Sequence, residues 1–115
     1  MILRSAKIDP AQLGSGAGIL YTVPPGFRAS IKQLTFTNTT ATARTITVYL
    51  VPSGGSPSAT NTIVSAMTIP PTGQGHVSLA HLFANQVLNP GDTVQALASA
   101  ATAISAMGGV IEELV

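Results

Sequence analysis

The 115-residue sequence has no cysteine and no tryptophan, and only 4% of its residues are aromatic. Without cysteine, the chain can form neither a disulfide framework nor a thiolate metal site. With so few aromatic residues, the core must be built from Val, Ile, Leu and Ala. Binding of glycans by ring stacking also has little support, because Tyr21 and Tyr49 are the only tyrosines.

Charge is equally scarce. Asp, Glu, Lys and Arg make up 8% of the chain, against about 25% in an ordinary soluble domain. A free monomer with so little surface charge is expected to be poorly soluble, so the composition predicts self-association as a dimer or trimer. The alternative is a monomeric β-domain that Ser and Thr keep hydrated. The net charge is +1, and the basic residues are scattered rather than clustered, which indicates no nucleic-acid partner.

One long stretch has no charge at all. Residues 94–111 could nearly span a bilayer by length, but they are mostly Ala, Ser, Thr and Gly, so membrane insertion would gain little. The sequence therefore predicts no membrane partner. The first ten residues also lack the apolar run and cleavage pattern of a signal peptide.

The residues that could perform chemistry are two histidines and four carboxylates. His76 and His81 are five residues apart and are expected on opposite faces of one strand. Asp92 follows a Pro-Gly turn, where its side chain is expected to bind local backbone. Glu112 and Glu113 are expected on a solvated edge. The sequence therefore predicts no catalytic residue, metal site or cofactor, and the chain is interpreted as a protein that is not an enzyme.

The most informative stretch is 21–52, which is interpreted as two long strands joined by a polar turn at residues 38–43. Apolar residues alternate with polar ones up to Ile31, and the phase then slips by one residue before Leu34. A slip would turn the apolar set towards water, so it predicts a β-bulge near Lys32 and Gln33. The pattern predicts a paired hairpin whose core residues are Phe27, Ile31, Leu34, Phe36, Ile46, Val48 and Leu50.

The remaining chain gives further short extended segments separated by turn signals. They are expected at 18–23, 62–69, 74–82, 93–98 and 103–111, the last two forming a second hairpin. The alanines of 95–107 would also suit a helix, but strands agree better with the rest of the chain. Seven or eight short strands predict an all-β fold, an antiparallel β-sandwich of the jelly-roll type.

Residues 1–17 are interpreted as an N-terminal arm or edge strand, and 18–115 as a single β-sandwich domain. Asp9-Pro10 is expected to interrupt any regular element, and glycines at 14, 16 and 18 loosen the connection to the domain. An arm cannot bury its aliphatic side chains on itself. It is therefore expected to dock on its own sheet or on a partner, with its basic residues facing acidic groups. The candidate partner-binding residues are Ile2, Leu3, Arg4, Lys7 and Ile8.

Several motifs resemble those of small β-sandwich structural proteins of tailed bacteriophages. Residues 21–26 read Y-T-V-P-P-G, and residues 34–40 form a strand that ends in an N-T-T turn. Residues 45–55 read T-I-T-V-Y-L-V-P-S-G-G, and residues 88–93 read L-N-P-G-D-T. The resemblance covers about residues 19–111.

This resemblance implies a virion protein assembled in the bacterial host cytoplasm, without catalytic residues. It implies a capsid decoration (cement) protein that binds the major capsid protein or other virion proteins. The alternative is a neck, tail or fibre component, including a receptor- or glycan-binding module.

Overall fold

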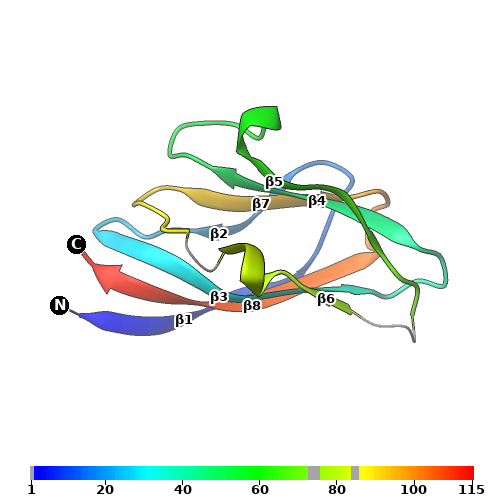
Figure 1. Cartoon of the computed structure of the whole chain (residues 1–115), viewed down its shortest axis with the longest axis horizontal. Helices are drawn as coiled ribbons and strands as arrows, with labels where there is room; N and C mark the ends of the chain where they lie inside the picture. Colours follow the sequence, from blue (N-terminus) through cyan, green and yellow to red (C-terminus); the bar gives the residue numbers. More distant parts are fainter. Residues whose placement is uncertain (1, 73–75, 84–85) are drawn as a thin grey trace.

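The protein is a sandwich of two four-stranded antiparallel sheets, described here from a computed structural model that covers residues 2–72, 76–83 and 86–115. The first sheet has the order β1-β8-β3-β6, with β1 at Leu3–Gln12, β8 at Ile104–Leu114, β3 at Phe27–Asn38 and β6 at His76–Ser78. The second sheet has the order β2-β7-β4-β5, with β2 at Gly18–Thr22, β7 at Thr93–Ala98, β4 at Arg44–Val51 and β5 at Thr62–Ile69. Figure 1 shows the two sheets stacked face to face. The predicted antiparallel β-sandwich is confirmed, with eight strands among the described residues.

Most successive strands lie in opposite sheets, which is the strand order of a jelly roll. The strands predicted around residues 38–43 and 99–102 are present, but the prediction that each pair forms a hairpin is wrong. β3 and β4 lie in different sheets, and so do β7 and β8. Each of these strands has one apolar face. Placing consecutive strands in facing layers buries both apolar faces against each other, whereas a hairpin would leave them side by side in one layer.

The turn between β3 and β4 is held by a buried side chain. Asn38 is 1% exposed, and its amide nitrogen donates hydrogen bonds to the carbonyl oxygens of Thr42 at 2.8 Å and Ile69 at 3.2 Å. Its amide oxygen accepts a bond from the Thr40 backbone N–H at 2.9 Å. Asn38 thus supplies the backbone partners that strand pairing would otherwise provide where the chain crosses between sheets.

The predicted β-bulge is confirmed. The pairing of β3 with β8 shifts register between Ile31 and Gln33, so the apolar face continues into Leu34. The opposite strand accommodates the bulge with a glycine: a Cβ atom on Gly108 would lie 2.0 Å from the Gln33 carbonyl oxygen. Only a residue without a side chain fits there, because no backbone atom can be approached that closely.

The core lies between the sheets and contains all seven predicted residues, five of them fully buried and two half-buried. Phe36, Leu34, Ile46 and Val48 are completely inaccessible to solvent, while Phe27 and Leu50 pack against the core from its margin. Phe83, which was not among the predicted core residues, is also fully buried.

The later segments agree in part with the sequence. Of the strand expected at 74–82, residues 74–75 lie outside the described residues, and the strand ends earlier than expected, because β6 (His76–Ser78) is followed by a 3₁₀ turn, η2, at Ala80–Phe83. The two histidines are therefore not on one strand. The alanine-rich segment forms β7 and the start of β8 rather than a helix. Within the described residues there is no helix with the length and apolarity needed to cross a bilayer.

Candidate functional site: the β1 edge and its Arg4–Glu112–Tyr21 network

Strand β1 forms one edge of the first sheet, paired with β8 along its length. The pairing runs in register from Leu3 opposite Glu113 to Ile8 opposite Gly108, then shifts before Ala11. Asp9 and Pro10 lie within that irregularity, so they distort the strand without ending it, contrary to expectation. Proline is tolerated there because an edge strand does not need every N–H for pairing.

The alternation of β1 sends the candidate arm residues to different places. Ile8 is buried in the core, whereas Ile2 and Leu3 are nearly 60% exposed. Lys7 points to solvent, with its ammonium nitrogen 3.7 Å from an Asp9 carboxylate oxygen. Both of those side chains are well exposed, and such surface pairs contribute little to stability.

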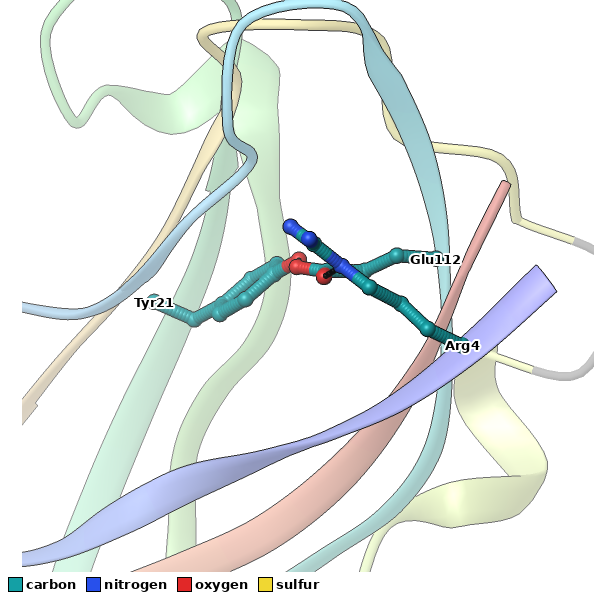
Figure 2. A network of polar contacts seen from close by, with 3 residues as sticks. All are labelled: Arg4, Tyr21 and Glu112. Atoms are coloured by element: carbon teal, nitrogen blue, oxygen red, sulfur yellow. Dashed lines mark hydrogen bonds and ion pairs between the residues drawn. The ribbon is translucent and has the colours of Figure 1, made fainter. Parts of the chain in front are cut away.

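Arg4 is the arm residue that makes the most specific contacts. Its Nε donates a hydrogen bond to Oε1 of Glu112 at 2.6 Å, and its guanidinium carbon lies 3.8 Å from the centre of the Phe27 ring. The hydroxyl of Tyr21 donates a hydrogen bond to Oε2 of Glu112. Figure 2 shows the three side chains converging from β1, β8 and β2. The network therefore connects the edge strand to its neighbour and links the two sheets.

The burial of Glu112 corrects the sequence prediction. Glu112 is 3% exposed, although it was expected on a solvated edge. A signal was available: Val110 and Glu112 are two residues apart in β8, and residues two apart in a strand share a face. Glu113 does point outward, where its carboxylate accepts a hydrogen bond from Nη2 of Arg28 at 2.7 Å.

The surroundings of Glu112 favour its ionised form. Burial alone would raise the pKa of this carboxyl, but the hydrogen bonds from Tyr21 and Arg4 and the charge of Arg4 outweigh it and hold the pKa below its usual value. Burial raises the pKa of the Tyr21 hydroxyl well above its usual range, and the hydrogen bond to Glu112 adds to that effect. At neutral pH the network thus has an anionic Glu112 and a neutral Tyr21.

This geometry fits a structural connection better than a catalytic one. Both carboxylate oxygens of Glu112 accept hydrogen bonds within the protein, and the residue is 3% exposed, so a substrate would have little access to it. Asp92 has the structural role that was predicted, because its carboxylate accepts bonds from the backbone N–H groups of Ser53 and Asn89 at 2.9 Å. In the part of the chain that the structure describes, no group of three His, Cys, Asp or Glu residues could hold a metal ion.

Both chain ends lie at the same end of the sandwich (Figure 1), and they include exposed aliphatic residues. The backbone N–H of Leu114 donates to the Ile2 carbonyl at 2.9 Å, and that of Val115 donates to the Gly26 carbonyl at 2.8 Å. The first bond holds the two ends of the chain side by side, and the second holds the C-terminal end beside the turn that precedes β3. The exposed residues of this terminal patch are Ile2, Leu3, Leu114 and Val115, each at least 44% exposed.

Comparisons with known proteins identify the fold. No protein-family model and no curated protein sequence matches the chain. A solved structure from work on Bacillus endospore appendages, described as a novel family of disulfide-linked pili, is similar with a TM-score of 0.58 and 16% identity. The similarity covers 99% of this chain and 88% of that one. A chain of infectious bursal disease virus, Gx strain, matches with a TM-score of 0.46 and 12% identity, over 97% of this chain and 33% of that one.

Proposed function

We propose that the chain is a non-enzymatic structural subunit of a tailed-phage particle, a capsid decoration protein that binds the head lattice through the terminal patch. The sequence motifs shared with tailed-phage β-sandwich proteins support the particle type. The terminal patch is the observation that supports a binding role. Its four residues are aliphatic and exposed, they lie where the two chain ends are hydrogen-bonded to each other, and exposed apolar surface is typical of interaction sites.

The network next to the terminal patch suits this role. Ile2 and Leu3 belong to a segment whose neighbour, Arg4, is fixed by Glu112 and Phe27. Ile8 anchors the same strand in the core. Holding β1 in place presents the aliphatic side chains in one geometry before binding, so less conformational entropy is lost when a partner docks.

The fold comparison is compatible with a role in assembly. The similar chain comes from work on disulfide-linked pili. The present chain has no cysteine, so its contacts with other subunits would be non-covalent. Burial of apolar surface and hydrogen bonding would then have to supply the binding energy.

The test is binding to particles that lack the protein. The variant is the double substitution Ile2→Ser, Leu3→Ser, which removes half of the terminal patch and leaves Arg4 and Ile8 intact. We expect at least a tenfold loss of binding, with a melting temperature close to that of the unmodified protein. The matched control is Val87→Ser, because Val87 is 59% exposed outside the terminal patch.

Three results would contradict the proposal: undiminished binding by the double variant, an equal loss in the Val87 control, or no binding by the unmodified protein. Electron microscopy of intact particles then separates a position on the head from one on the neck or tail. Point variants are preferable to deletion of residues 1–13, because deletion would also remove the contacts of Arg4 and Ile8.

A further inference from the structure

We propose that the outer face of the β2-β7-β4-β5 sheet is a self-association surface, which packs against the same face of a second copy. This inference rests on the proposed assembly role but concerns a different surface from the terminal patch. We call it the uncharged face; its residues are the outward-pointing side chains of all four strands.

Strand register places these residues in rows. Ile19 of β2 lies opposite Gln95 of β7, Gln95 lies opposite Tyr49 of β4, and Tyr49 lies opposite Thr62 of β5. A second row contains Leu97 opposite Thr47. The side chains point outward because the alternate positions of β7, which are Val94, Ala96 and Ala98, are buried in the core.

The four strands of this sheet contain a single charged residue, Arg44, at the first position of β4. The rest of the face consists of Thr, Ser, Gln, Tyr and aliphatic side chains. The outward positions of the other sheet differ, since Lys7, Arg28 and Glu113 project from them. The scarcity of charge in the sequence is therefore concentrated on one side of the sandwich.

The absence of charge on this face indicates which kind of surface can cover it. Burying an ionised side chain costs several kcal/mol unless it is paired, so a surface without charges is best covered by another surface without charges. The outer face of the first sheet does not meet this requirement, because its Lys7–Asp9 and Arg28–Glu113 pairs would lose water against a surface that offers them no new charge. The uncharged face of a second copy does meet it, and a twofold axis would bring the two faces together.

The size of the face limits how strong the contact can be. Four strands about 4.8 Å apart, with about seven residues each at about 3.3 Å per residue, give an area of about 450 Å² per copy. Two copies would then bury about 900 Å², which is below the ~1,200 Å² of standard interfaces and fits a weak, transient one. We therefore expect a weak dimer, detectable at micromolar to ~100 micromolar concentration. Sheets packed in this way cross at about 30°.

Gln95 provides a sharp test, because it lies between Ile19 and Tyr49 in the first row. The variants Gln95→Glu and Gln95→Lys each place one charge in the face, and Gln95→Glu hardly changes the shape. The matched controls are Gln33→Glu and Gln33→Lys, at an exposed glutamine of the other sheet. Sedimentation velocity over a concentration series gives the dimer dissociation constant of each protein, and thermal melting checks that each is folded.

We expect the unmodified protein and both Gln33 variants to dimerise, and each Gln95 variant to have a dissociation constant at least tenfold higher. A monomeric unmodified protein at ~100 micromolar would overturn the inference, as would a dimer that the Gln95 variants leave unchanged. If the Gln95 variants do not fold, Leu97→Lys is measured in their place. Failure of this inference can be distinguished from failure of the proposed function, since particle binding is tested with variants of the terminal patch.

Discussion

The two sheets of the sandwich bury similar apolar inner faces and differ in their charge. Strands β1, β3 and β8 of the first sheet contain seven of the nine charged residues, three in β1 and two in each of the others. The strands of the second sheet contain only Arg44. Since both sheets contribute to one core, the difference is not required for folding. It is the difference on which the proposed self-association of the second sheet rests.

The edge strands of the two sheets also differ in charge and in proline content. The β1 edge has an irregular register near Pro10 and a charged residue, Arg4, that points inward. Both features prevent edge-to-edge pairing in natural sheets. The edge strands of the second sheet, β2 and β5, contain neither charge nor proline. The edge strands of the second sheet also have an irregular register, so the β1 edge differs from them by its charge and its proline.

The largest expected loss of stability comes from truncating a core side chain, and it should be similar in the two sheets. Phe36→Ala in β3 is expected to destabilise the protein by about 3–5 kcal/mol, and Ile46→Ala in β4 by about 2–5 kcal/mol, because each removes a fully buried side chain and leaves a cavity. Denaturant unfolding measures both. A cost below ~1 kcal/mol for either variant would mean that its sheet does not share the common core.

A smaller effect tests the bulge in the first sheet. Gly108→Ala would place a Cβ atom 2.0 Å from the Gln33 carbonyl oxygen, so we expect a loss of about 2–4 kcal/mol in unfolding free energy. Gly109→Ala is the control, because the nearest atom to its Cβ position is 3.7 Å away. Equal effects of the two substitutions would show that the bulge does not press on Gly108.

Substitutions at Glu112 and Glu113 test how much the buried charge of Glu112 contributes to stability. Glu112→Gln keeps the shape but removes the charge that faces Arg4, and we expect a loss of about 1–3 kcal/mol at pH 7. Glu113→Gln, beside it on the exposed face, should cost less than about 1 kcal/mol. Urea unfolding of the two variants gives both values, and a larger loss for Glu113→Gln would contradict the assigned burial.

The smallest effect is the pH dependence of that network. The pKa of Glu112 is lower in the folded protein than in the unfolded chain. Its contribution is therefore fully present above the unfolded pKa of about 4.3. The contribution is lost as the pH falls through the folded pKa. The difference in melting temperature between the unmodified protein and Glu112→Gln should shrink between pH 5 and pH 3. A difference that stays constant over this range would exclude ionised Glu112 as its source.

Local patterns in the sequence determined the strands. Alternation and turn residues placed the strands at 62–69 and 93–98 with the bounds that the structure has. The phase slip before Leu34 located the bulge. These features could be predicted because a strand with one buried face has a period of two, and a bulge is the ordinary way to keep that face buried after a slip.

Contacts between distant parts of the chain decided the rest. The strands on either side of the turn at residues 38–43 belong to different sheets, Gly108 faces the bulge of β3, and Glu112 is buried beside Arg4 and Tyr21. Residues 4 and 112 are at opposite ends of the sequence, so no local pattern could indicate their pairing. Alternation states which face of a strand is apolar. Which strand lies opposite that face depends on how all eight strands fill one core, because packing density and hydrogen bonding must be satisfied for the whole sandwich at once.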